Sequence, residues 1–238
     1  MISQISINNK LITNIKPIRH SFNNKNNKFS AIGFFKDKKV KIYEVFDKNQ
    51  GHLMKFIAKN KELSKYFPEL IAYNNKFIVE EWVNGITLKK TKSIFKKNII
   101  QSEEIKYVID TLWSLDYKVE VFDYLKFLYE RIGAKCTLNL KNLPIKVNHN
   151  DLSLDNIILT EDGLKIIDNE FLGCNTGWIM NIHNSFIKVN FEYQKYISKD
   201  ALEELYRIRA KWHKVYLKKF KTPKSGIRNI FSRFYKVK

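Results

Sequence analysis

The sequence contains few cysteines and no long apolar run, and these absences exclude several classes of protein. Cys136 and Cys174 form neither a metal-binding pattern nor a disulfide framework, which indicates two small buried side chains in a reducing compartment. No apolar run is long enough to cross a bilayer. Residues 1–20 lack the apolar stretch of a signal peptide. We therefore expect a cytoplasmic protein.

Acidic residues are also scarce. The 238 residues include 43 Lys and Arg but only 24 Asp and Glu, which gives a net charge of +19. Such a charge suits nucleic acid, an anionic membrane surface or an anionic substrate as a partner. The distribution is uneven, because residues 211–238 contain ten Lys or Arg and no acid. That segment supplies about half of the excess.

The chain nevertheless has enough apolar material to fold. It is 44% hydrophobic, with 17 Phe and 12 Tyr, so a disordered basic protein is excluded. Its length fits one large domain or two small lobes that share a cleft.

The N-terminal third has the pattern of strands with one helix among them. Residues 29–46 predict a hairpin around a polar turn, and residues 50–66 have apolar positions at helical spacing. A further strand begins at Lys76 and ends at the turn marked by Asn84 and Gly85.

From about Ser102 onward the apolar spacing is helical. One stripe covers residues 105–112 and a second covers 122–132. A short hairpin follows over residues 157–167, and a long helix is predicted from about 200 to 220. The layout predicts an α+β fold, in which a β-rich N-terminal part with one helix precedes a mainly helical part with one small hairpin.

Polar residues bracket the short hairpin. The stretch "NHNDLSLDNIIL" places Asp151 and Asn156 before the first strand, and "KIIDNE" places Asp168 after the second. Pairing of the two strands would bring these three oxygen-bearing side chains to one end of the hairpin. Two carboxylates and an amide suit a hard cation such as Mg²⁺. One carboxylate can instead accept a proton from an attacking hydroxyl, which is the division of roles that phosphoryl transfer needs.

The pattern His149-x-Asp151-x4-Asn156, followed by Asp168-x-Glu170, resembles the phosphotransfer signature of the aminoglycoside phosphotransferase and choline kinase superfamily. These are small-molecule kinases with a two-lobed, protein-kinase-like fold. The resemblance implies that Asp151 is the catalytic base and that Asn156 and Asp168 hold Mg²⁺ at the phosphates of ATP. We expect His149 to be a structural hydrogen-bonder, whereas Glu170 either supports the loop or faces the substrate.

The resemblance covers roughly residues 20–190. A kinase of this kind needs a strand lysine for the phosphates, and "KKVKIYEVF" offers Lys41, with Lys39 as a rival on the same face. The segment "FIVEEWVNG" resembles the hinge between the lobes, where the backbone from Glu81 to Val83 would meet adenine.

Two features depart from the family. The expected phosphate loop at 21–29 has no glycine, although its Ser and Asn residues can supply turns and amides. The glutamate that should pair with Lys41 is also absent from its usual place, because Glu62 comes late in the helix and Gln50 stands at its start. After Asp168 there is no protein-kinase activation-loop anchor, which favours a small-molecule or glycan hydroxyl as the acceptor.

The expected organisation has three parts: a nucleotide lobe at 1–83, a helical catalytic lobe at 84–210 and a basic extension at 211–238. In the extension, apolar residues from 227 to 235 fall on one stripe with Arg and Lys largely off it. This pattern fits a helix on an anionic membrane surface, or a helix that packs on the catalytic lobe.

The sequence therefore predicts an ATP-dependent, Mg²⁺-dependent kinase for a hydroxyl of a small molecule or of an envelope sugar or lipid precursor. It would act at the inner face of the membrane, and no motif requires nucleic acid. The alternative is a nucleotide-binding pseudokinase or a basic scaffold on membrane or nucleic acid, for which both Asp151 and Asp168 would be superfluous.

Overall fold

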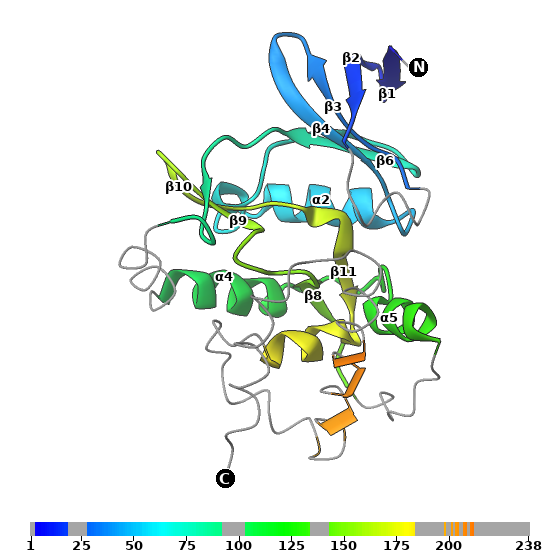
Figure 1. Cartoon of the computed structure of the whole chain (residues 1–238), viewed down its shortest axis with the longest axis vertical. Helices are drawn as coiled ribbons and strands as arrows, with labels where there is room; N and C mark the ends of the chain where they lie inside the picture. The colour runs from blue at the N-terminus through cyan, green and yellow to red at the C-terminus, as the bar shows by residue number, and fades with distance from the viewer. Residues whose placement is uncertain are drawn as a thin grey trace.

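The computed structural model describes residues 3–18, 28–91, 103–133 and 143–183, together with 198, 201, 203, 204, 207, 208, 210 and 211. A twisted antiparallel sheet forms one end of the molecule, one helix lies beneath it, and the remaining helices and two small sheets form the rest (Figure 1). The predicted α+β class is confirmed.

The large sheet has six strands in the order β1-β2-β3-β4-β6-β5. Their bounds are β1 Gln4–Ile7, β2 Lys10–Pro17, β3 Ser30–Phe35, β4 Lys38–Glu44, β5 Leu70–Tyr73 and β6 Phe77–Glu81. The predicted hairpin at 29–46 is confirmed as β3 and β4, and the strand predicted from Lys76 is β6. Strands β1 and β2 were not predicted from the alternating Ile residues of the N-terminus.

Side chains of β4 point alternately to the two faces of this sheet. Val40 and Ile42 pack into a small cluster of buried residues confined to the sheet. Tyr43 belongs to a second, larger cluster that continues through the helix beneath the sheet into the rest of the molecule. Because residues two apart share a face, Lys41 lies on the inner face with Tyr43.

The helix beneath the sheet is α2, Gln50–Lys59, and it is shorter than predicted. Asn60 ends it, because its backbone is extended and its side-chain oxygen accepts from the backbone N–H groups of Glu62 and Leu63, which starts a new turn. The single turn η1, Ser64–Tyr66, follows.

Residues 103–133 form two helices, α4 Glu103–Ser114 and α5 Tyr124–Ile132. Two small sheets accompany them, one of β10, β9 and β7 and one of β11 and β8. The remaining bounds are β7 Ile86–Thr87, β8 Lys146–His149, β9 Ile157–Thr160, β10 Gly163–Ile166, η2 Asn169–Phe171, β11 Leu172–Asn175 and η3 Thr176–His183.

Both helical stripes are confirmed, with one difference at the second. Phe122 precedes α5 rather than joining it, because Asp123 caps the helix by accepting from the backbone N–H of Lys126. Gly133 ends α5 in the left-handed conformation. The hairpin predicted at 157–167 is confirmed as β9 and β10, paired Gly163 to Thr160 through Ile166 to Ile157.

Several predictions fall partly or wholly outside the described residues. They are the phosphate loop at 21–27, Cys136, most of the helix from 200 to 220, and the extension from 212. Cys174 is buried, as predicted. None of the helices in the described ranges is long and apolar enough to cross a membrane.

Candidate functional site

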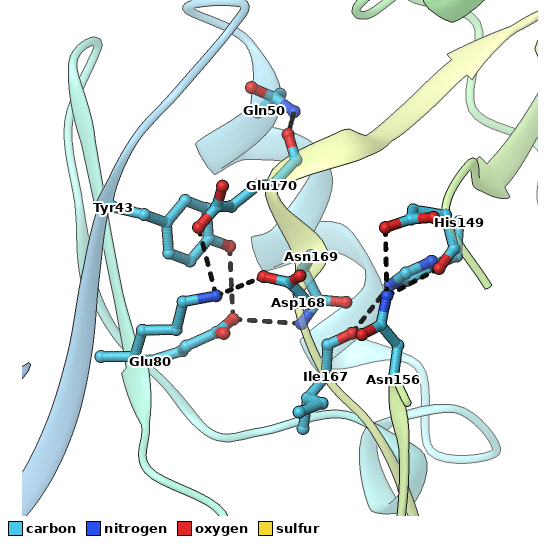
Figure 2. Close-up of polar contacts among 11 residues, drawn as sticks. Tyr43, Gln50, Glu80, His149, Asn156, Ile167, Asp168, Asn169 and Glu170 are labelled. Carbon is cyan, nitrogen blue, oxygen red and sulfur yellow. Dashed lines mark hydrogen bonds and ion pairs between the residues drawn. The ribbon is translucent and has the colours of Figure 1, made fainter. Parts of the chain in front are cut away.

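The turn after β8 holds Asp151 against the β9–β10 hairpin. Asn156 is the link, since its Nδ2 donates to the Asp151 carbonyl oxygen at 2.7 Å and lies 3.2 Å from Asp151 Oδ2 (Figure 2). The backbone N–H of Ile167 in turn donates to the Asn156 carbonyl at 2.9 Å. The predicted meeting of the two ends of the hairpin therefore occurs, and Asp168 comes one residue beyond this contact.

Asp168 has an unusual backbone. Its φ of 64° and ψ of 48° place it in the left-handed region, where an L residue other than Gly is strained, although Asp and Asn tolerate it best. This conformation starts η2 and turns the chain from the hairpin toward the large sheet. Backbone strain of this kind, about 1 kcal/mol or more, is typical of functional sites.

Lys41 reaches Asp168 across the molecule. Its Nζ lies 2.6 Å from Asp168 Oδ1 and 3.3 Å from Glu170 Oε1. Burial alone would lower the pKa of Lys41, but the nearby carboxylates of Asp168, Glu170 and Glu80 outweigh it and raise that pKa well above its usual value. Lys41 is therefore a permanent cation that joins β4 to a segment 127 residues away.

Lys39, the rival lysine, has a different environment. It is exposed, and its Nζ lies 4.0 Å from the centre of the Trp82 ring. Lys41 alone of the two contacts the predicted metal-binding carboxylate.

Glu80 is a buried acid that the sequence analysis did not single out. It lies directly opposite Lys41 in the pairing of β4 with β6, and only 1% of it is exposed. Its Oε2 accepts from the Tyr43 hydroxyl at 3.2 Å and from Asn169 Nδ2 at 3.1 Å. Burial raises its pKa to about 7, and Lys41 and the two hydrogen bonds hold it from rising further. The sequence carried a signal for the burial of Glu80, because β6 is an apolar strand that is buried on both faces, and an acid in the middle of such a strand must be buried too.

The start of α2 contributes an amide where a kinase of the predicted type has an acid. Gln50 is buried; its Oε1 accepts from the backbone N–H of Phe46 at 2.6 Å and of Asp47 at 3.1 Å. Its Nε2 donates to the carbonyls of Glu170 and Leu172 at 2.9 and 2.8 Å. α2 contains no Asp or Glu, so the acids around Lys41 come from β6 and from the segment after β10.

Glu62, the other residue considered as a partner for Lys41, is exposed in the turn after α2. Its backbone N–H is bonded to Asn60. The carboxylates that contact Lys41 come from Asp168 and Glu170, far along the chain, so a search for an acid in α2 could not identify them.

His149 is buried beneath the turn. Its Nε2 lies 3.0 Å from the carbonyl oxygen of Ile167, so this nitrogen carries the hydrogen and donates. Burial lowers the pKa of His149, and the neutral imidazole thus links β8 to the residue before Asp168. This is the arrangement expected of a structural hydrogen-bonder.

The predicted hinge follows β6. The backbone N–H of Glu81 is bonded to the Glu69 carbonyl at 2.9 Å, and that of Trp82 to the Lys39 carbonyl at 3.1 Å. The backbone N–H and carbonyl of Val83 have no hydrogen-bond partner within the described part of the chain. Gly85 brings this segment close to β9, because a Cβ there would lie 2.4 Å from the Leu159 carbonyl oxygen.

The site therefore combines one lysine with the carboxylates of Asp168, Glu170 and Glu80 (Figure 2), and the hydrogen bond from Ile167 to Asn156 places Asn156 beside the residue before Asp168. With all groups ionised, the three acids exceed the lysine by two charges, which favours binding of a cation. Among the described residues there is no cluster of three or more His, Cys, Asp or Glu placed as metal ligands.

Comparison with known proteins gives matches only among solved structures. No family model matches, and no curated protein matches. The chain is similar to a thermostable mutant of aminoglycoside phosphotransferase APH(4)-Ia, with a TM-score of 0.49, 10% identity, and coverage of 87% of this chain and 86% of that one.

It is also similar to choline kinase from Cryptosporidium parvum Iowa II, with a TM-score of 0.41, 16% identity, and coverage of 87% and 73%. A third match is spectinomycin phosphotransferase APH(9)-Ia in complex with ADP and spectinomycin, with a TM-score of 0.40, 13% identity, and coverage of 93% and 87%.

Proposed function

We propose that the chain is an ATP-dependent phosphotransferase that acts on a hydroxyl group of a small molecule. The observation that carries the proposal is the ion pair of 2.6 Å between Lys41 and Asp168. It joins the strand that would hold the nucleotide phosphates to the loop that would hold the metal.

The residues fit Mg²⁺ as the metal. This ion prefers oxygen ligands, keeps several waters, and is usually held by one or two carboxylates, so a larger acidic cluster is not needed. The amide nitrogen of Asn156 donates to Asp151, and its amide oxygen has no hydrogen-bond partner among the described residues. The buried Asn169 Oδ1, next to Asp168, also lacks a partner there. Oxygen atoms of this kind are what a metal with its waters can satisfy.

Each residue then has a defined role. Asn156 and Asp168 would hold the metal, which neutralises charge on the transferred phosphoryl group. Lys41 would bind the phosphates. Its ion pair with Glu170 would keep it in place if the Asp168 carboxylate binds the metal instead of Lys41. Asp151 would accept the proton of the attacking hydroxyl, and the unpartnered backbone of Val83, with Glu81, would meet the adenine.

The acids around Lys41 favour an enzyme over a pseudokinase. The missing helix glutamate was the main reason to consider an inactive protein. Glu170 and Asp168 contact Lys41 directly and Glu80 lies opposite it, so a carboxylate partner is present from another source.

The first test is thermal unfolding with and without Mg-ATP. Saturation at about 100 times Kd stabilises the folded state by about 2.7 kcal/mol, which for a chain of this size raises Tm by about 5–10 °C. Asp168→Asn keeps a side chain that tolerates the left-handed backbone, and it should abolish the magnesium-dependent part of the rise. Asp162→Asn, at the exposed turn of the β9–β10 hairpin, is the matched control and should retain it. No rise in the wild-type protein would refute the proposal.

For the acceptor, we infer an anionic sugar or lipid precursor of the envelope, since the net charge of +19 suits an anionic partner better than a cationic alcohol. The basic extension from 211 would hold the protein at an anionic membrane. Phosphate transfer to such precursors, and sedimentation with anionic liposomes, test the two parts. Full activity on soluble alcohols without liposome binding would contradict both.

A further inference from the structure

The buried acid that faces Lys41 from β6 has no role in the proposed chemistry. The hydrogen bonds of the Glu80 side chain reach Tyr43 and Asn169, and none of them reaches Asp151, Asp168 or the hinge backbone. Its burial is nevertheless nearly complete, and its neighbours are the residues around the site. Burial of a carboxylate is costly unless hydrogen bonds and a nearby cation offset the loss of water.

Glu80 lies between two parts of the site. On one side it accepts from Tyr43, which shares a face of β4 with Lys41 and whose ring centre lies 5.0 Å from Lys41 Nζ. On the other side it accepts from Asn169, the residue that follows Asp168. One oxygen, Oε2, receives both hydrogen bonds, so it ties the lysine strand to the start of η2 (Figure 2).

Through Asn169, the hydrogen bond to Glu80 affects the segment that contains Asp168. Asp168 has a strained left-handed backbone, and such a conformation persists only where its surroundings fix it. The hydrogen bond from Asn169 to Glu80 fixes the residue that immediately follows. α2 cannot supply this contact, because the amide of Gln50 is fully engaged with backbone groups of Phe46, Asp47, Glu170 and Leu172.

We propose that Glu80 is a positioning residue, which holds the left-handed backbone of Asp168, the expected metal ligand, by accepting hydrogen bonds from Asn169 and Tyr43. The inference rests on the proposed function, since it concerns the same metal and nucleotide site. The role belongs to the hydrogen bonds and not to a fixed negative charge. Consistent with this, burial raises the pKa of Glu80 to about 7, so that near neutrality the group is only partly ionised.

The test measures the affinity for the non-hydrolysable nucleotide AMP-PNP by calorimetry, with and without excess Mg²⁺. Glu80→Ala removes both hydrogen bonds and should weaken binding in Mg²⁺ by about tenfold, with little change in its absence. Glu80→Gln keeps an acceptor oxygen of the same reach and should remain within about threefold of the wild type. Glu62→Gln, an exposed acid of the same type, is the matched control.

A second variant covers the case in which Glu80→Ala does not fold. Tyr43→Phe keeps the ring but removes the hydroxyl that donates to Glu80, and it should lose part of the same magnesium-dependent affinity. Equal weakening with and without Mg²⁺ would indicate a general packing defect and overturn the proposal. So would an unchanged Glu80→Ala, or a Glu80→Gln as weak as Glu80→Ala.

The magnesium dependence of the wild-type affinity distinguishes failure of this inference from failure of the proposed function on which it rests. A wild type whose affinity does not depend on Mg²⁺ would refute the proposed function. A magnesium-dependent wild type with an unaffected Glu80→Ala would refute the positioning role alone.

Discussion

Replacement of Glu80 by Gln should change stability in a way that depends on pH. The pKa of Glu80 is raised from 4.5 to about 7 by burial, so the folded state binds this proton more tightly than the unfolded state. When folding raises the pKa of an acid, ionisation of that acid destabilises the folded state. This loss of stability is absent below the unfolded pKa and is fully present above the folded pKa. Wild-type stability should therefore fall as the pH rises from about 4.5 to 7.

The magnitude follows from the size of the shift. A difference of about 2.5 pKa units corresponds to about 3 kcal/mol at pH 8, whereas at pH 5 only about 1 kcal/mol of the cost has developed. Glu80→Gln removes the ionisable group and keeps an acceptor for Asn169 or Tyr43. We expect the variant to gain about 2–3 kcal/mol over the wild type at pH 8, after a small loss in hydrogen-bond strength, and little at pH 5.

Urea unfolding of both proteins at pH 5, 6, 7 and 8 measures this difference. Glu62→Gln should match the wild type throughout, because Glu62 is exposed. A stability gain of the same size at pH 5 and pH 8 would refute the reasoning, since it would show that packing, and not ionisation, separates the two proteins. A loss of stability at pH 8 would show that the charge of Glu80 stabilises the fold.

Three further predictions concern residues that hold the site together. Gln50→Leu removes four hydrogen bonds to buried backbone groups and should cost about 2–4 kcal/mol in urea unfolding; a cost under 1 kcal/mol would mean that water replaces the amide. Because the pKa of His149 is lowered, its neutral form stabilises the fold above pH 6.5, and that contribution disappears as the pH falls below it. His149→Gln should therefore lose less stability than the wild type between pH 6.5 and 5, and an identical acid profile would contradict a buried neutral imidazole. Gly85→Ala places a Cβ 2.4 Å from the Leu159 carbonyl at a positive φ of 153° and should lower Tm by several degrees, whereas Gly163→Ala meets no atom within 4 Å and should lower it less.

The parts of the site that were predictable from the sequence are those set by local spacing. Asn156 and Asp168 flank the β9–β10 hairpin, so the pairing of its two strands fixes their relation without knowledge of the rest of the fold, and Asp151 comes a few residues before the hairpin. Lys41 was predicted from the apolar residues and the tyrosine around it, because alternation along the strand puts Lys39 on the same face and does not separate the two lysines. The α+β class followed from the alternation of apolar and polar residues in the strands and from the helical spacing of apolar residues after Ser102.

The remaining features depend on contacts between distant segments. Glu80 and Gln50 are ordinary residues of a strand and a helix until the fold brings them to Asn169 and to the carbonyl of Glu170. The end of α2 at Asn60 depends on a side-chain hydrogen bond that competes with the helix, and apolar spacing over 50–66 does not reveal it.

The four hydrogen bonds of Gln50 have a mechanical consequence. In a protein kinase, the ion pair between the strand lysine and a helix glutamate can be broken by displacement of that helix, and this controls activity. Here α2 is attached to the backbone of Glu170 and Leu172, on either side of Phe171, and carries no acid of its own. The helix cannot swing outward without pulling that segment along. Lys41 stays with its carboxylates as long as the segment stays in place, so an outward displacement of α2 alone would not separate the lysine from them.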